Sequence, residues 1–163
     1  MKGPSKGALV LAIHLAIVLG IAAKARYDRE TLPHVWVKTV PVDPEHPLLG
    51  RYVRLWLQVE GCQTLPLGIS RARLVLRDGR LCAEVQPGEI YGPMVTNGPA
   101  GARLSDAVMY YIPEHVPDPS RRPAGEELWV EVAVSEHGIP RPVRLGVKSA
   151  GGEIRPLDLA SSK

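Results

Sequence analysis

The sequence predicts a mainly β protein, in which an N-terminal transmembrane helix precedes a small antiparallel β-sandwich or open barrel. One long apolar run occupies residues 7–23, and about eight short stretches of alternating apolar and polar residues follow it, separated by turn residues. Glycine and proline number 16 each and phenylalanine is absent, which suits many turns and short strands. The length of 163 residues allows one hydrophobic core.

The apolar run at residues 7–23 would be about 26 Å long as a helix, near the lower limit for a bilayer core of about 30 Å. One interpretation is a cleaved signal peptide, with Lys2 and Lys6 before the run and Ala23-Lys24-Ala25 as the cleavage site. The other is an uncleaved anchor, because the run is longer than the usual apolar segment of about 7–15 residues in a signal peptide. We favour the anchor.

The expected organisation follows from this choice. Residues 1–25 form the membrane anchor (or signal peptide), and residues 26–163 form an extracytoplasmic β domain. The expected location is the inner membrane, with a single pass and with the body in the periplasm. The bilayer is therefore one expected partner.

Small residues recur at every fourth position of the apolar run, at Ala8, Ala12, Ala16 and Gly20. On a helix they share one face, where a second helix can approach closely. Alternatively, the recurrence reflects only how common alanine is in such helices. His14 lies roughly opposite this face, and an ionisable residue within a membrane is a functional candidate. We favour a neutral His14 near a partner or a water-filled defect.

The formal net charge of +3 comes from the N-terminal region. Lys2, Lys6 and Lys24 supply it, because residues 25–163 contain equal numbers of basic and acidic residues. A nucleic-acid-binding protein needs a clustered basic face. We therefore expect no nucleic-acid partner.

Alternating runs identify the strands of the body. Asp78-Gly79 separates two of them and predicts a two-residue hairpin, since a type I′ turn needs positive φ at both central positions. Residues 92–106 show neither a helical nor a strand period and are predicted to be a loop. The expected strands are 34–40, 51–59, the two arms of 71–85, 107–113, 128–134, 143–147 and 153–159.

The strand at 51–59 has the clearest alternation. Its apolar residues, at 53, 55, 57 and 59, point to the core, and the intervening residues point to solvent. Tyr52, Arg54 and Trp56 therefore line one face, which Trp129 of another strand joins across the sheet in this interpretation. Tyrosine, tryptophan and arginine are enriched at interaction hot spots. The alternative is that these aromatic residues cap a small core, with Arg54 stacked on them.

Cys62 and Cys82 are the two cysteines of the chain. In an oxidising compartment they can pair and close a loop of about 20 residues, worth about 3 kcal/mol. In a reducing compartment they would be free and buried. Their spacing does not indicate a zinc site.

Three Glu-His pairs suggest a metal site, in which His46, His115 and His137 gather with Glu114 around one ion. Each pair lies in a predicted turn, and no HExxH-like spacing fixes the ligands. We favour solvated turns and expect no metal and no cofactor. None of the serines has the sequence context of a nucleophile, and no phosphate-binding or dinucleotide-binding motif occurs. The sequence therefore favours a protein that is not an enzyme.

The segment "PVDPEHPLLGRYVRLWL", residues 41–57, resembles the segment that names the GDYXXLXY family of bacterial membrane-anchored proteins. Gly50, Tyr52 and Leu55 match named positions, whereas Arg51 replaces the aspartate and Leu57 replaces the final tyrosine. "YYIPE", which contains Pro113 and Glu114, resembles the second half of the family.

The resemblance implies a single-pass, envelope-exposed β domain of uncharacterised function. Members are often encoded beside multi-pass membrane proteins, so a multi-pass partner is implied by association. Arg51 replaces a negative group, so a role in which that aspartate binds a cation does not carry over. We expect an accessory or interaction module for a multi-pass membrane protein. The alternative is an envelope protein that binds a ligand or a metal.

Overall fold

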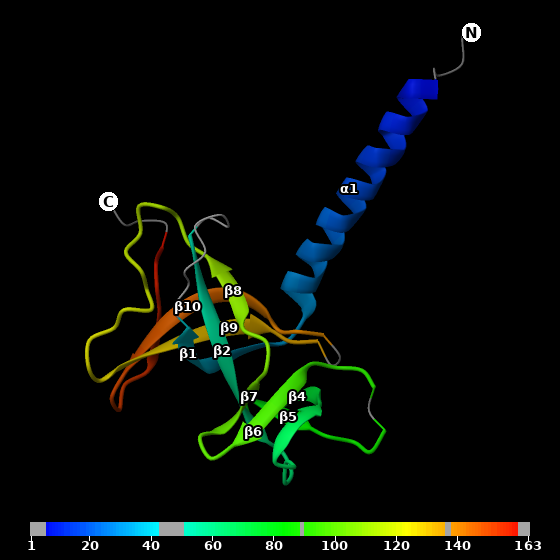
Figure 1. Cartoon of the computed structure of the whole chain (residues 1–163). Coiled ribbons are helices and arrows are strands. Elements are labelled where there is room, and N and C mark those ends of the chain that lie inside the picture. Colours follow the sequence, from blue (N-terminus) through cyan, green and yellow to red (C-terminus); the bar gives the residue numbers. More distant parts are fainter. Residues whose placement is uncertain (1–5, 43–50, 89, 136–137, 160–163) are drawn as a thin grey trace. The chain divides into compact units, whose positions relative to one another are not determined.

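The computed structural model describes residues 6–42, 51–88, 90–135 and 138–159. The chain divides into two compact units, Met1–Leu32 and Pro33–Lys163. Within the described residues, the first unit contains one helix and the second contains eleven strands, and Figure 1 shows the helix and the strands of the body. The mainly antiparallel β body that follows an apolar helix confirms the predicted fold class.

Helix α1 spans Lys6–Thr31 and is long and apolar enough to cross a membrane. Its 26 residues correspond to about 39 Å, so it continues about two turns beyond the apolar run. The C-terminal turns are polar and carry ion pairs from Lys24 to Asp28 at 3.0 Å and from Arg26 to Glu30 at 2.9 Å. The helix therefore extends past residue 25, where the predicted anchor ends.

The residues of the predicted packing face all lie on α1. Ala8, Ala12, Ala16 and Gly20 are all exposed within this unit. The Nδ1 atom of His14 lies 2.9 Å from the carbonyl oxygen of Val10, one turn earlier in the same helix. The imidazole thus has a hydrogen-bond partner in its own helix.

The strands of the body form one open sheet in the order β11-β10-β9-β1-β2-β7-β6-β3. All pairs are antiparallel except β2 with β5. Three further strands lie off this path: β5 and β8 each pair with β2, and β4 pairs with β5. The strands are β1 His34–Val42, β2 Tyr52–Gly61, β3 Gly68–Arg71, β4 Arg73–Arg77, β5 Arg80–Glu84, β6 Met94–Gly98, β7 Gly101–Leu104, β8 Val108–Tyr111, β9 Glu126–Ala133, β10 Arg141–Ser149 and β11 Ile154–Pro156.

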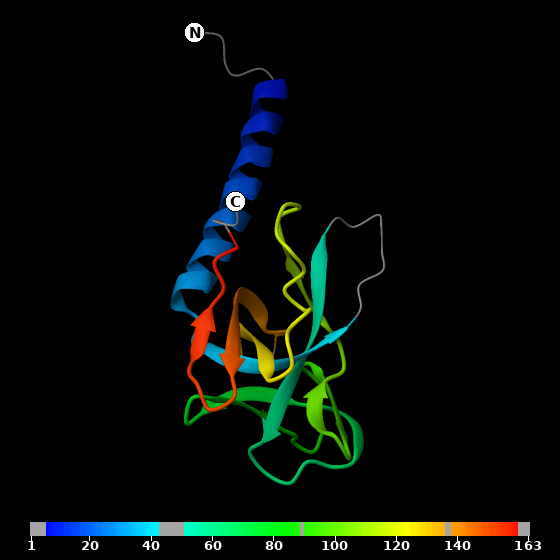
Figure 2. The same cartoon turned by 90° about the vertical axis from the view of Figure 1, so that its left-hand side faces the viewer.

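Strand β2 organises the body because its partners change along its length. It pairs with β1 over Arg54–Leu57 and with β8 over Tyr52–Leu55. It then pairs with β7 at Gln58 and Val59 and with β5 at Glu60 and Gly61. Figure 2 shows β1 and β2 crossing, so that the two strands diverge beyond their paired segment.

The core contains the apolar side chains that the alternation of β2 predicts. Val53, Leu55 and Leu57 are fully buried, and Val59 is nearly so. Val35 and Val37 of β1 and Val130 and Val132 of β9 belong to the same cluster. Leu55, one of the residues that match the GDYXXLXY motif, therefore enters the core as expected.

The Asp78-Gly79 turn confirms the predicted hairpin. Asp78 and Gly79 have φ values of 50° and 72°, and Arg77 pairs with Arg80. An aspartate tolerates this conformation and glycine adopts it freely. The turn thus joins β4 and β5 as the sequence indicates.

The predicted loop at residues 92–106 is wrong, because this segment contains strands β6 and β7. The two strands form a hairpin in which Gly98 pairs with Gly101. Only Val95 and Leu104 of the two strands are buried, so the alternation was too short to recognise. Backbone pairing with β3 on one side and β2 on the other keeps these polar strands in the sheet.

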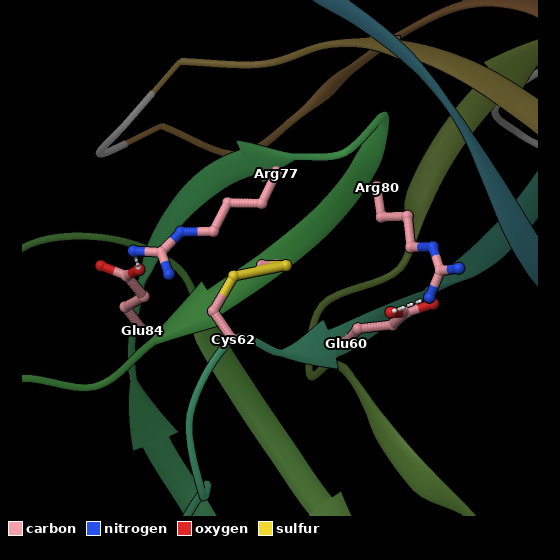
Figure 3. The surroundings of a disulfide bond; sticks show 6 residues. Glu60, Cys62, Arg77, Arg80 and Glu84 are labelled. Atoms are coloured by element: carbon pink, nitrogen blue, oxygen red, sulfur yellow. Dashed lines mark hydrogen bonds and ion pairs between the residues drawn. A yellow bond between two sulfur atoms is a disulfide. The ribbon is translucent and has the colours of Figure 1, made fainter.

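The structure pairs Cys62 with Cys82, which resolves the alternatives that the sequence left open. The bond connects the end of β2 to β5, with the two Cα atoms 5.3 Å apart (Figure 3). Ion pairs flank it, from Arg77 to Glu84 at 2.6 Å and from Arg80 to Glu60 at 3.1 Å. The disulfide closes the segment that holds β3 and β4.

Candidate interaction site

The polar face of strands β10, β9, β1 and β2 carries all three tryptophans of the chain. Each lies in the opposite phase to the buried valines and leucines of its strand, so its ring covers the outer side of the sheet. A cationic side chain lies over each ring. The pairs are Arg103 over Trp56 at 3.8 Å, Arg144 over Trp36 at 5.4 Å and Lys148 over Trp129 at 5.2 Å.

The cation over Trp56 comes from a strand that the sequence did not reveal. Arg103 lies on β7, opposite Gln58 of β2, and is therefore a diagonal neighbour of Trp56. The capping alternative stacks Arg54 on the aromatic residues of this strand, whereas the guanidinium over the Trp56 ring belongs to Arg103. Such a contact is worth about 0.5–1 kcal/mol at an exposed site.

Tyr52 does not lie on an exposed face, so this part of the prediction is wrong. It is 5% exposed and lies opposite Tyr111 of β8, with the ring centroids 6.2 Å apart. Strand β8 pairs with the start of β2 and covers Tyr52. The sequence pattern could not indicate this pairing. Tyr111, at 63% exposed, is the ring of this pair that faces solvent.

Trp129 does not join Trp56 directly, because β1 lies between their strands. The cross-strand neighbours of Trp129 are Lys38 of β1 and Gly146 of β10, whereas Trp56 lies opposite Val40. The four predicted interaction residues therefore do not form one patch. Trp129 instead lies beside a groove that also includes Trp36.

This groove, here called the tryptophan groove, has a volume of about 830 Å³. It lies where β1 and β2 diverge. Its lining includes the side chains of Trp36, Lys38, Trp129 and Lys148 and the turns at residues 78–80 and 100–102. Half-buried aromatic rings, cationic side chains and backbone thus meet in one open depression. Nothing in the alternation pattern indicated that β1 and β2 separate here.

The indole of Trp36 packs against the sheet at Gly146, because glycine has no side chain that would block it. A Cβ atom at Gly146 would lie 2.7 Å from Cζ3 of Trp36 and 2.9 Å from Cγ2 of Ile154. Both distances are too short for carbon atoms in contact. Gly146 is therefore the reason that the indole can lie flat across β9 onto β10.

We expect Gly146→Ala to displace Trp36 and to lower the free energy of unfolding by about 1–3 kcal/mol, the usual cost of overpacking. Tryptophan fluorescence and urea denaturation would measure the two effects. Gly152→Ala is the control, because its Cβ would meet its nearest atom at an ordinary 3.5 Å. Equal free energies of unfolding for the two variants would contradict the inference that Trp36 packs against Gly146.

A carboxylate orients the basic and aromatic groups beside the groove. Lys38 Nζ donates a hydrogen bond to Glu127 Oε1 at 2.5 Å, and Trp129 Nε1 donates to Glu127 Oε2 at 3.2 Å. The hydrogen bond from Lys38 lowers the pKa of Glu127, and partial burial opposes this effect. The bond from Trp129 and the charges of Lys38 and Lys148 lower the pKa further.

We expect Glu127 to titrate below its ordinary pKa of 4.5, and its pKa to rise in Lys38→Met. Because the pKa is lower in the folded state, the carboxylate stabilises the fold above its unfolded-state pKa. This contribution is lost as the pH falls through the folded-state value. NMR titration of the Glu127 carboxyl carbon measures the shift. An unchanged pKa of Glu127 in Lys38→Met would contradict the inference that Lys38 lowers this pKa.

The residues proposed for a metal site are not brought together where the structure describes them. Glu114 and His115 lie in an exposed turn after β8, where Arg51 donates a hydrogen bond to the Glu114 carbonyl oxygen. His46 and His137 lie outside the described residues. Among the described residues, no group of three histidine, cysteine, aspartate or glutamate side chains is placed to hold a metal ion.

The positions of the family resemblance are described in part. Gly50 lies outside the described residues, Tyr52 is buried, and Leu55 is in the core. Pro113 is exposed, and its carbonyl oxygen accepts a hydrogen bond from Val116 N at 3.2 Å. Tyr52 and Leu55 therefore have structural roles in the packing of the body.

Comparison with protein-family models, curated proteins and solved structures gave no match to this chain. The resemblance to the GDYXXLXY family stays a prediction. Function must accordingly be inferred from the helix, the disulfide and the tryptophan groove.

Proposed function

We propose that this protein is a membrane-anchored accessory module, held in the inner membrane by α1, whose β body binds a multi-pass membrane protein on the periplasmic side. The observation that carries the proposal is the combination of a helix able to cross a membrane with a disulfide-bonded β body. Disulfides persist in oxidising compartments and are rare in the cytosol. The Cys62–Cys82 pair therefore supports a body outside the cytoplasm.

Two surfaces support an interaction role. The small residues of α1, at positions 8, 12, 16 and 20, offer a face for helix packing within the bilayer. The tryptophan groove offers half-buried aromatic and cationic side chains on the body, which are residue types enriched at binding hot spots. The protein thus has one candidate contact in the membrane and one outside it.

Purification of the full-length chain from bacterial membranes in mild detergent tests this function. We expect a multi-pass membrane protein to be recovered in stoichiometric amount and to be identified by mass spectrometry. Ala16→Leu adds bulk to the small-residue face and is expected to reduce this recovery at least tenfold. Ile17→Phe adds bulk outside the small-residue face, about 100° around α1 from Ala16, and is the matched control.

Recovery of the chain alone, under detergent conditions that preserve other membrane complexes, would contradict the proposal. Equal loss of the partner from Ala16→Leu and Ile17→Phe would contradict the assigned helix face. Both variants keep the helix apolar, so membrane insertion should be unchanged and is checked by extraction with carbonate.

A further inference from the structure

Over His34–Lys38, the edge of β1 beside the tryptophan groove forms no ladder with another strand of the described residues, although β5 packs close to β1. Strand β1 pairs with β9 over His34–Lys38 but with β2 only from Thr39 onward. Beyond Leu57, β2 has no ladder with β1: β7 pairs along the opposite edge of β2, and β5 pairs with β2 at Glu60 and Gly61. The side of β1 that β2 leaves, around Trp36, therefore borders the groove.

The hydrogen-bond phase of β1 shows which backbone groups point to this edge. Val134 N donates to the carbonyl oxygen of Pro33 at 3.0 Å, which makes Pro33 and Val134 a hydrogen-bonded pair. In an antiparallel ladder such pairs recur at every second residue, so the backbone groups of Val35 and Val37 also face β9. The N–H and C=O of Trp36 consequently face the groove.

A donor and an acceptor on one extended residue are complementary to the backbone of another extended chain. Strand addition uses this complementarity for affinity, and side-chain pockets beside the new strand supply specificity. The tryptophan groove has both elements, because the rings of Trp36 and Trp129 and the side chains of Lys38 and Arg80 surround the open edge.

We propose that the tryptophan groove binds an extended polypeptide segment, which adds as a strand beside Trp36. The inference rests on the proposed function and assigns to the body its class of partner, a linear segment of a membrane protein. At about 3.3 Å per residue, the stretch from residue 34 to 38 accommodates about five residues. The volume of about 830 Å³ is open along the surface, as a chain that enters and leaves requires.

The probe for this site is a phage-displayed library of linear seven-residue peptides, selected on the full-length chain in detergent micelles. A selected peptide is then synthesised and added to ¹⁵N-labelled protein. We expect it to slow hydrogen exchange of the Trp36 amide at least tenfold, because that N–H gains an acceptor. The Val35 amide, already directed at β9, is the internal control and should change much less.

Two variants separate backbone pairing from ring contacts. Trp36→Ala and Trp36→Pro both remove the indole, but only proline removes the N–H, and proline is tolerated where a strand edge faces no partner. We expect Trp36→Pro to bind the peptide at least fivefold more weakly than Trp36→Ala. Circular dichroism checks folding, and the exchange measurement on unmodified protein decides the matter if Trp36→Pro does not fold.

The proposal is overturned if no selected peptide protects the Trp36 amide, or if folded Trp36→Ala and Trp36→Pro bind equally. It is also overturned if an oligomer of N-acetylglucosamine, and no peptide, shifts the resonances of the groove. Recovery of a stoichiometric multi-pass partner together with any of these results would leave the proposed function standing and reject the groove as a strand-binding site.

Discussion

Replacement of Cys62 by alanine is expected to lower the free energy of unfolding of the body by about 3 kcal/mol. The bond to Cys82 restricts a loop with a sequence separation of 20 residues, and its loss increases the conformational freedom of the unfolded chain. It also removes the link that holds β5 beside the end of β2, where these strands pair at only two positions. This is a large fraction of the stability of a typical domain.

Urea denaturation followed by tryptophan fluorescence measures this loss selectively, because all three tryptophans lie in the body. Cys82→Ala should give the same result as Cys62→Ala, since either change removes the bond. Reduction of the unmodified protein should have a comparable effect. If both variants unfold at the same urea concentration as the oxidised protein, the disulfide does not stabilise the fold.

Gly92→Ala is expected to be the most damaging of the single substitutions at the glycines that the structure describes in the body. Gly92 has a φ of 94°, and a Cβ atom there would lie 2.3 Å from the carbonyl oxygen of Ala72. Since that oxygen belongs to the backbone, a rotamer change cannot relieve the clash. The backbone at residue 72 or 92 would have to move to relieve the clash. This movement would strain the adjacent hydrogen bond that Ala72 N donates to the Pro93 carbonyl oxygen at 3.0 Å.

Gly101→Ala is the matched control for Gly92→Ala. Gly101 has a φ of 96°, but a Cβ atom there would meet no atom within 4 Å. The control should lose about 1–2 kcal/mol from the left-handed conformation alone, and Gly92→Ala should lose about 1–3 kcal/mol more. Thermal or urea denaturation compares the two. Equal losses would mean that the contact with Ala72 is not limiting.

The fold was predictable where local patterns and burial agree. The alternation of β2 identified Val53, Leu55 and Leu57 as core residues because one face of an antiparallel strand is buried. The Asp78-Gly79 turn was predictable because its geometry demands these residue types. Strands β6 and β7 were missed because backbone pairing, rather than apolar side chains, holds most of their length.

The candidate site was predictable only in part, since it depends on which strands are neighbours. The sequence identified Trp56 and Trp129 but placed them together, whereas β1 separates their strands. Trp36 was already recognisable, because it alternates with Val35 and Val37 in the polar phase of its strand. Arg103 could not be assigned to Trp56, because its strand was interpreted as a loop. The groove itself results from the divergence of β1 and β2, which no local pattern records.

We propose that an uncleaved helix holds an oxidised β body outside the cytoplasm. The most direct measurement is the intact mass of the chain extracted from washed bacterial membranes in the presence of a thiol-alkylating reagent. The account predicts a chain of 17.7 kDa that retains residues 1–25, carries no alkyl group before reduction and gains two after it. Two alkyl groups without prior reduction, or a chain that begins after Ala25, would contradict it.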